Sequence, residues 1–215
     1  SYYFYPRIEL VEQIVEDRSK EMNVLDIGCG CGAISCRIRS QYTNAKTYGI
    51  EISKQAAKIA ACGMEVLRGD VEELEFPWPD EFFDYVIMGD VLEHLREPAE
   101  VLVRLKRHIK KDGYIIVSMP NMKHFSVMLP LIMNDCFSYT DSGILDRTHL
   151  KMYTATEMLR MIIGSGYEVE RIQYTTYGEP DEEQIKQIDA LVSMAEGTDR
   201  TVYLAYQYII KAKVS

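Results

Sequence analysis

The residues with the clearest chemical potential lie in a glycine-rich segment near the start of the chain. Residues 24–32 read VLDIGCGCG, so an apolar run passes into alternating glycines. Glycine is needed where a backbone bends tightly or lets a ligand come close. In a doubly wound sheet, such a loop follows the first strand and lies at the edge where ligands bind. The segment therefore predicts a ligand-binding turn.

Two carboxylates follow this segment at informative positions. Glu51 ends the next apolar run, 19 residues after Gly32. That is the expected position of a carboxylate that binds ribose hydroxyls in a nicotinamide or an adenosyl cofactor. Asp70 ends the third run, in the sequence RGDV, where it can accept a hydrogen bond from an adenine amino group.

The choice between these two cofactors rests on charge and on the end of the chain. Gly28, Gly30 and Ala33 satisfy the dinucleotide pattern G-x-G-x-x-G/A, which keeps NAD as an alternative. Asp26, however, adds negative charge beside the loop, which disfavours a pyrophosphate and favours a cationic ligand. The chain also ends in what reads as an antiparallel pair of strands, unlike a second parallel half-sheet.

The elements that position these residues alternate between strands and helices. Strands are predicted at 22–27, 47–52, 64–68, 83–88 and 113–119, the last opened by a turn at 111–113, and helices at 6–19, 32–41, 53–62 and 97–110. This alternation predicts a parallel sheet with helices on both faces, the doubly wound α/β class. Residues 121–150 read as irregular with one short helix, rich in Met and aromatic residues.

The C-terminal part adds two helices and two strands. We predict a helix at 154–163, with a capping box formed by Thr154 and Glu157, and an acidic helix at 180–195 that begins at Pro180. Strands are predicted at 167–177 and 201–211. We expect one domain over residues 1–215, divided into an N-terminal helix (1–20), a cofactor-binding core (21–120), a lid or acceptor segment (121–150) and a C-terminal helix with closing strands (151–215).

Composition excludes several classes of partner. The 215 residues include 24 basic and 33 acidic side chains, for a net charge of −9. This argues against nucleic acid and an anionic membrane surface, and no stretch approaches the length of a membrane helix. The five cysteines, three of them at 29, 31 and 36, favour free thiols in a reducing, cytoplasmic compartment over disulfides or a metal site. Because the chain lacks a starting Met, Ser1 is expected to be a tag remnant or a truncation point.

Four segments, taken in order, carry a resemblance to a known family. LDIGCGCG, GIEIS, GDVEEL and FDYVIMGDVLEHL resemble the successive motifs of class I S-adenosylmethionine-dependent methyltransferases. The resemblance implies a Rossmann-like, doubly wound sheet of seven strands with an antiparallel last strand. It also implies a set of cofactor-binding residues: Asp26, Gly28, Cys29, Gly30, Gly32, Glu51, Ile52, Asp70, Val71, Gly89 and Asp90. Among these, Asp26 would help to place the amino group, Glu51 would hold the ribose, and Asp90 would line the cleft near the methyl group.

A finer resemblance lies in the C-terminal half and at the start of the chain. FSYTD at 137–141, LDRTHL at 145–150, Tyr153-Thr154 and the opening Tyr5-Pro6-Arg7 are similar to a methyltransferase subgroup associated with family 2 glycosyltransferases. This suggests a glycan acceptor and association with a glycosyltransferase. We expect the acceptor side of the site to include Asn121, Tyr139 and Arg147.

Two histidines are candidates for the general base. His149 lies in the polar cluster 146–149 within an apolar region, and Asp146, three residues earlier, would orient its ring if the segment is helical. His94 follows the fourth strand, where backbone hydrogen bonds would also explain it. We favour His149 over His94 as the group that takes the acceptor proton.

The sequence therefore predicts a methyltransferase that uses S-adenosylmethionine and releases S-adenosylhomocysteine. We expect metal-free O-methylation of a small-molecule or sugar acceptor, because no set of metal ligands is evident in the sequence. Two alternatives remain open: a non-catalytic protein that binds an adenosyl cofactor, and an NAD-dependent oxidoreductase.

Overall fold

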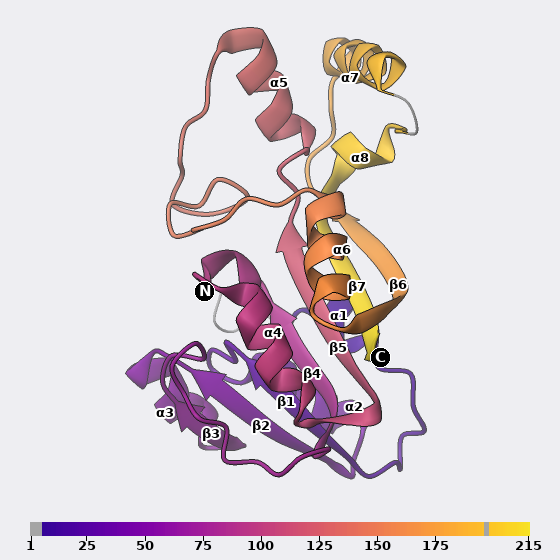
Figure 1. Cartoon of the computed structure of the whole chain (residues 1–215). Coiled ribbons are helices and arrows are strands. Elements are labelled where there is room, and N and C mark those ends of the chain that lie inside the picture. The colour runs from indigo at the N-terminus through magenta and orange to yellow at the C-terminus, as the bar shows by residue number, and fades with distance from the viewer. Residues whose placement is uncertain (1–5, 196–197) are drawn as a thin grey trace.

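The computed structural model describes residues 6–195 and 198–215. Seven strands form one sheet: β1 (Met22–Ile27), β2 (Ala45–Glu51), β3 (Glu65–Arg68), β4 (Phe83–Gly89), β5 (Ile109–Pro120), β6 (Tyr167–Thr176) and β7 (Ala205–Val214). Their order is β3-β2-β1-β4-β5-β7-β6 (Figure 1). The first five strands pair in parallel, whereas β7 is antiparallel to both β5 and β6. This is the Rossmann-like sheet with an antiparallel last strand that the sequence predicts.

Alternating apolar residues in the strands build a core on each face of the sheet. In β1, Leu25 belongs to one buried cluster and Val24 to the other. In β5, Ile115 and Ile116 divide in the same way. Successive side chains of a strand point to opposite faces, so a sheet that is apolar at every position needs a cover on both sides.

Helices provide that cover on both faces. The helical elements are α1 (Ile8–Val11), α2 (Ala33–Gln41), α3 (Lys54–Ala60), the 3-10 helix η2 (Leu92–His94), α4 (Pro98–Lys106), α5 (Phe125–Asn134), α6 (Ala155–Gly164), α7 (Glu182–Met194) and α8 (Thr201–Leu204). Buried residues of α4 and α6 pack into the cluster that contains Leu25, and those of α1 and α2 pack into the cluster that contains Val24.

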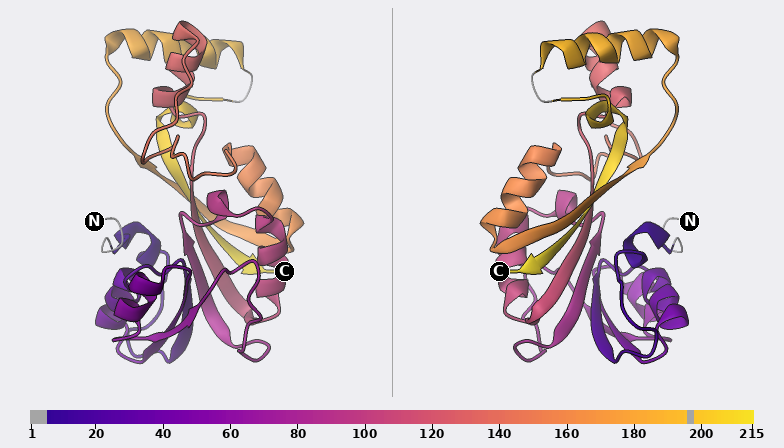
Figure 2. Two further views of the ribbon diagram at one scale, coloured as in Figure 1. Left: turned by 90° about the vertical axis from the view of Figure 1, so that its left-hand side faces the viewer. Right: turned by 90° about the vertical axis from the view of Figure 1, so that its right-hand side faces the viewer.

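Three helices stand beyond one end of the sheet. Figures 1 and 2 show α5, α7 and α8 together, above the carboxyl end of β5. Phe125 and Leu129 of α5 pack there with Ile188 of α7 and Tyr203 of α8 in a small core of their own. The predicted short helix in 121–150 is thus α5, and the rest of that segment returns toward the sheet.

Four local predictions are wrong. The helix predicted at 6–19 is limited to Ile8–Val11; beyond it, Ile14 is buried and its neighbour Val15 is 65% exposed. The predicted turn at 111–113 lies inside β5, where a register shift between Phe83 and Tyr85 accommodates the extra residues. Because β5 already begins at Ile109, the helix predicted at 97–110 ends earlier, and α4 stops at Lys106.

The two other errors concern the ends of elements. The side chain of Thr154 accepts no capping hydrogen bond at the start of α6. A capping box instead opens α7, formed by Asp181 and Gln184, and Pro180 precedes it. The strand predicted at 201–211 begins as the helical turn α8 and becomes β7 only at Ala205.

Candidate active site

The glycine-rich loop connects β1 to α2 at the carboxyl edge of the sheet. Gly28 has a φ of 68°, and a Cβ atom there would lie 2.8 Å from Cγ2 of Val91. Gly32, the N-cap of α2, has a φ of 84°. Side chains at these positions would be strained, and at Gly28 one would also collide with Val91. The loop therefore needs glycine for its conformation and leaves its backbone open to the adjoining cavity.

Glu51, at the end of β2, braces this loop. The side chain is 5% exposed, and its Oε2 accepts a hydrogen bond of 2.8 Å from the backbone N–H of Gly30. Its Oε1 accepts a second one, of 2.7 Å, from the N–H of Ser53. Each carboxylate oxygen has two lone pairs, so Glu51 can still accept hydrogen bonds from a ligand.

Asp26, in β1, is the most unusual charged group near the loop. It is 1% exposed, and neither of its carboxylate oxygens has a hydrogen-bond partner within the described part of the chain. Burial, and secondarily the charge of Glu51, raises its pKa to about 8. A buried carboxyl group in this state favours a positively charged ligand nearby, because such a charge would stabilise the ionised form.

Beside the loop lies a cavity of about 350 Å³. Its lining includes six of the residues that the sequence assigned to the cofactor: Gly28, Glu51, Ile52, Asp70, Val71 and Asp90. The other five do not line it: Asp26, Cys29, Gly30, Gly32 and Gly89. Asp26 and Cys29 are buried behind the loop, and a Cβ at Gly89 would meet Leu10 of α1, on the other side of the sheet.

A second cavity, of about 720 Å³, adjoins the first. Asp90 and His94 line both cavities, so they mark the junction. Five carboxylates border the larger cavity: Glu9, Asp90, Glu93, Asp141 and Asp146. Among the described residues of its lining, the only Lys or Arg is Arg7, which already forms ion pairs with Glu9 and Asp90. The charged side chains of the larger cavity are therefore mostly acidic.

Asp90 is held in place from three directions. It follows β4 with a φ of 54°. Its carboxylate accepts hydrogen bonds from the Arg7 guanidinium, from the Ser118 hydroxyl at 2.9 Å and from the Gln207 amide at 2.8 Å. These partners come from the N-terminal segment, β5 and β7. Sequence reasoning did not assign Arg7 or Gln207 to the site, because only the fold brings them to the end of β4.

His94 and His149 face each other across the junction. Their ring centroids are 4.8 Å apart in an edge-to-face arrangement. Nδ1 of His94 lies 3.1 Å from the Thr148 carbonyl oxygen, and Nδ1 of His149 lies 2.8 Å from that of Ile144. A carbonyl can only accept, so each Nδ1 carries a hydrogen, and the neutral form of the His149 ring keeps its lone pair on Nε2. Burial lowers the pKa of His149, which favours this neutral form.

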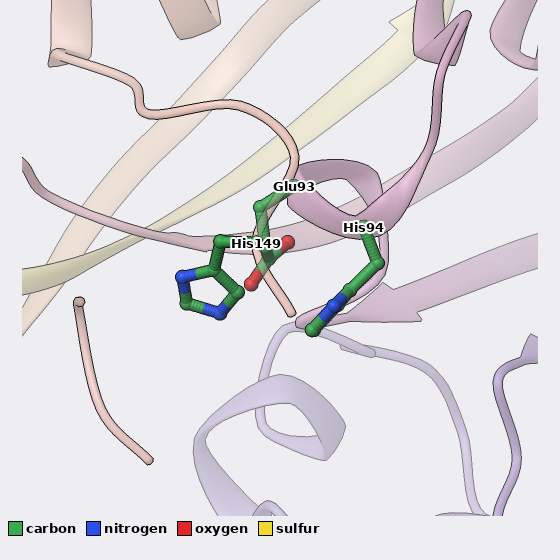
Figure 3. A group of neighbouring side chains, drawn as sticks. All are labelled: Glu93, His94 and His149. Atoms are coloured by element: carbon green, nitrogen blue, oxygen red, sulfur yellow. The ribbon is translucent and has the colours of Figure 1, made fainter. Parts of the chain in front are cut away.

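Glu93 lies beside the two imidazoles, as Figure 3 shows. Its side chain is 0% exposed, and neither carboxylate oxygen has a partner among residues 6–195 and 198–215. Burial, and secondarily the charge of Asp90, raises its pKa well above the ordinary range. Its backbone carbonyl accepts hydrogen bonds from Leu150 and Lys151, which brings the segment carrying His149 to η2. The sequence analysis missed Glu93, although it directly precedes His94.

The predicted pairing of Asp146 with His149 is wrong. The segment is not helical, and the Asp146 carboxylate accepts hydrogen bonds from the backbone and hydroxyl of Thr148 instead. The Ile144 carbonyl orients the His149 ring. Asp146 still lies close enough for its charge to act on His149.

The three residues predicted on the acceptor side do not line the larger cavity. Asn121 is fully buried and donates its amide hydrogens to the carbonyls of Val202 and Ala205. Tyr139 is 55% exposed and packs edge-to-face on Phe137. Arg147 forms an exposed ion pair with Asp141. Other members of 121–150 do border the cavity: Asp141, Ser142, Gly143, Asp146, Thr148 and His149.

The cysteines near the glycine loop differ in environment. All five cysteines of the chain are free; Cys29 is buried, Cys31 is half-buried and Cys36 is exposed on α2. Within the described ranges, no helix has the length and apolar character that crossing a membrane requires.

Comparison with known proteins defines the class. Residues 1–172 match the family model described as "Methyltransferase domain". The chain therefore belongs to the methyltransferase domain family. It is a methyltransferase whose methyl donor is S-adenosylmethionine, and membership of the family excludes the oxidoreductase alternative.

Individual relatives agree with this class at low identity. A ubiquinone biosynthesis O-methyltransferase of Rickettsia canadensis (strain McKiel) is 27% identical over 177 residues, covering 79% of this chain and 72% of the relative. Among solved structures, SAM-dependent methyltransferases of Aquifex aeolicus and Archaeoglobus fulgidus superpose with TM-scores of 0.64 and 0.63 at 19% and 20% identity. They cover 99% and 91% of this chain, and the chain covers 91% and 87% of theirs. This likeness confirms the fold.

Proposed function

We propose that this methyltransferase transfers a methyl group to a hydroxyl oxygen of an uncharged, polar acceptor, a sugar hydroxyl being the first choice. One observation carries the proposal: a cavity beside the glycine loop and a larger acidic cavity meet at Asp90 and His94. Methyl transfer needs donor and acceptor in line, which two adjoining cavities can provide.

The smaller cavity is the proposed cofactor site. The buried, unpartnered carboxyl of Asp26 and the open backbone at Gly28 fit a cofactor with positive charge. We assign the ribose hydroxyls to Glu51, the adenine to Ile52, Asp70 and Val71, and the methionine part to the loop. When bound, S-adenosylmethionine supplies a methyl group activated by a positively charged sulfur.

The charge of the larger cavity supports the class of acceptor. Its described lining carries more acidic than basic side chains, which disfavours a carboxylate acceptor, and the carboxyl oxygens can accept hydrogen bonds from hydroxyl groups. The Rickettsia relative is named as an O-methyltransferase, which also supports oxygen as the acceptor atom. The resemblance of 137–154 to the glycosyltransferase-associated subgroup supports a glycan, and association with a glycosyltransferase is part of this proposal.

The acceptor proton leaves as the new bond forms. The acceptor oxygen bonds to the methyl carbon, the carbon–sulfur bond breaks with its electron pair remaining on sulfur, and the proton needs a destination. Nε2 of His149 offers a free lone pair in the neutral ring, beside the junction. We take direct proton transfer to Nε2 of His149 as the first choice, and His94 is the second choice for the base.

The test is transfer of isotope-labelled methyl from S-adenosylmethionine to a panel of uncharged glycosides, phenols and carboxylic acids. We expect label in methyl ethers, which resist mild base, and Gly28→Val as an inactive control because its side chain meets Val91. Label found only in methyl esters, which mild base cleaves, would overturn the proposal.

A further inference from the structure

Three side chains at the junction of the cavities form a group that the direct-base role leaves partly unexplained. Glu93, His94 and His149 each offer a ligand atom, and these atoms all lie within 4.8 Å of one another. Glu93 comes from the middle of η2 and His149 from the segment that pairs with it (Figure 3). A mechanism in which one histidine is the general base needs neither the second imidazole nor the buried carboxylate.

The carboxylate of Glu93 is the observation that points to a ligand. It is 0% exposed, directed between the two imidazoles (Figure 3), and has no hydrogen-bond partner in the described part of the chain. Leaving such a group unpaired in the interior costs several kcal/mol. A proton would neutralise its charge but would still need an acceptor, whereas a cation would satisfy the oxygens directly.

The hydrogen bonds of the two imidazoles also favour a cation as their ligand. The carbonyls of Thr148 and Ile144 fix each Nδ1 as a donor, so both Nε2 lone pairs are free. Metal-ligating histidines characteristically donate their other ring nitrogen to a carbonyl or carboxylate in this way. The charge of Asp90 acts on both Glu93 and His149, and that of Asp146 acts on both histidines, which adds attraction for a cation.

We propose that Glu93, His94 and His149 bind a divalent first-row transition cation, with at least one coordination position open toward the larger cavity. Two imidazoles and one carboxylate with open positions suit Zn²⁺, Mn²⁺ or Co²⁺ rather than Ca²⁺. Ligand atoms about 2.1 Å from such an ion lie roughly 3.4 Å apart in a tetrahedral arrangement. Small side-chain rotations bring a group within 4.8 Å to that spacing.

With a cation bound, the lone pair of His149 would act as a metal ligand instead of accepting the proton directly. An acceptor hydroxyl bound at the open position would have a lowered pKa, so its proton leaves to water while its oxygen attacks the methyl carbon. This role in transfer rests on the proposed function, whereas the cation site itself does not. It replaces the metal-free mechanism that the sequence led us to expect.

The site is tested by titrating the full chain with Co²⁺ alone and following its visible absorption, with metal content measured after dialysis. The wild type should bind one equivalent. Glu93→Gln should lower the affinity by about 10-fold or more, and His149→Ala by about 100-fold. Neither residue lines the cofactor cavity, so unchanged binding of S-adenosylhomocysteine shows that the variants are folded. His108→Ala is the matched control, because that ring lies elsewhere, against Phe76.

Absence of Co²⁺ binding in the wild type, or an affinity for Co²⁺ in both Glu93→Gln and His149→Ala equal to that of the wild type, would overturn the proposed cation site. The role in transfer has its own test, because turnover should fall on chelation and return with added metal. Full turnover in the chelated enzyme overturns that role and leaves His149 as the base. Failure of the proposed function is distinguishable from both, because it appears as wrong acceptor chemistry with Co²⁺ binding intact.

Discussion

At the scale of single residues, Glu51 supports the glycine loop and, in the function we propose, also binds the cofactor ribose. Its two oxygens already accept hydrogen bonds from Gly30 and Ser53, so the loop is braced in a binding conformation before the cofactor arrives. A carboxylate fixed in this way loses little conformational freedom when it accepts ribose hydroxyls. Removal of Glu51 therefore affects both the ligand contact and the shape of the loop.

Glu51→Ala should weaken binding of S-adenosylhomocysteine by about 2–4 kcal/mol, because charge-assisted hydrogen bonds to ribose are lost. Isothermal titration calorimetry measures this directly. Glu65→Ala, at an exposed position of β3, is the control and should bind as the wild type does. An affinity of Glu51→Ala within twofold of the wild type would show that Glu51 is not the ribose ligand.

His124 predicts a pH dependence of stability. It is 0% exposed, and burial lowers its pKa from 6.5 to about 4. Between these values the unfolded chain binds a proton that the folded chain does not, so the free energy of unfolding falls as the pH falls. From pH 7 to pH 5 this one group should cost about 2 kcal/mol.

The measurement is urea unfolding of the wild type and His124→Phe at several pH values between 7 and 5. Phe removes the titrating ring, so the variant should lose less stability over this range, whatever its absolute value. Asp26 and Glu93, with raised pKa values, act in the opposite direction in both proteins and cancel in the difference. Parallel curves for the two proteins would contradict the prediction.

At the scale of elements, the segment 141–149 forms part of the lining of the larger cavity. It lacks regular helix or strand, and it is tied to η2 through the hydrogen bonds from Leu150 and Lys151 to Glu93. Segments with few backbone hydrogen bonds open more easily than central strands. Binding of a ligand at the junction should therefore order this segment more than it orders the sheet.

Hydrogen exchange in the presence and absence of S-adenosylhomocysteine tests this difference. Amides of 141–149 should exchange much faster than those of residues 83–88 in the free protein, and should slow when the ligand binds. The central strand β4 is buried between β1 and β5 and provides the internal reference. Protection of 141–149 as deep as that of β4 in the free protein would identify the segment as ordinary core.

The same elements show what the sequence could and could not predict. The strands β1, β2 and β4 are rich in apolar residues and are ended or followed by glycine or an acidic residue, so the sequence could predict both their positions and the edge where a ligand binds. The C-terminal end of α1 could not be predicted in this way, because the burial of Ile14 and the exposure of Val15 depend on the packing of the chain around α2. Similarly, α8 interrupts the last predicted strand only because Tyr203 packs against α5 and α7.

The residues of the candidate site also differ in whether the sequence could predict their positions. Gly28 and Glu51 follow from local sequence patterns, because their spacing within one strand–helix–strand unit, β1-α2-β2, determines where they lie. Glu93 and His149 are 56 residues apart, and backbone hydrogen bonds between η2 and the 150–151 segment bring them together. No periodicity in the sequence reports such a contact. The assignment of Asp146 to His149 was wrong because it assumed a helix where the chain turns.

At the scale of the whole molecule, the site is assembled from both halves of the sheet. The glycine loop, β2 and the segment that follows β3 contribute to the smaller cavity, whereas β5, β7 and the 141–149 segment contribute to the larger one. Asp90, at the end of the central strand β4, connects the two, and its partners Arg7, Ser118 and Gln207 span nearly the whole length of the chain. Occupation of the junction should therefore stabilise the entire fold.

Thermal unfolding tests this coupling and the identity of the cofactor together. A ligand that binds only the folded state stabilises it by about 2.7 kcal/mol at 100 times its dissociation constant. In a protein of this size that corresponds to a rise in Tm of roughly 5–10 °C. S-adenosylmethionine and S-adenosylhomocysteine should both produce it, and NAD at the same concentration should not, because the buried Asp26 carboxyl is stabilised in its ionised form by a nearby cation and gains nothing from a pyrophosphate. Gly28→Val should abolish the shift while unfolding cooperatively; equal shifts with NAD, or none with either adenosyl ligand, would contradict the assignment of the smaller cavity.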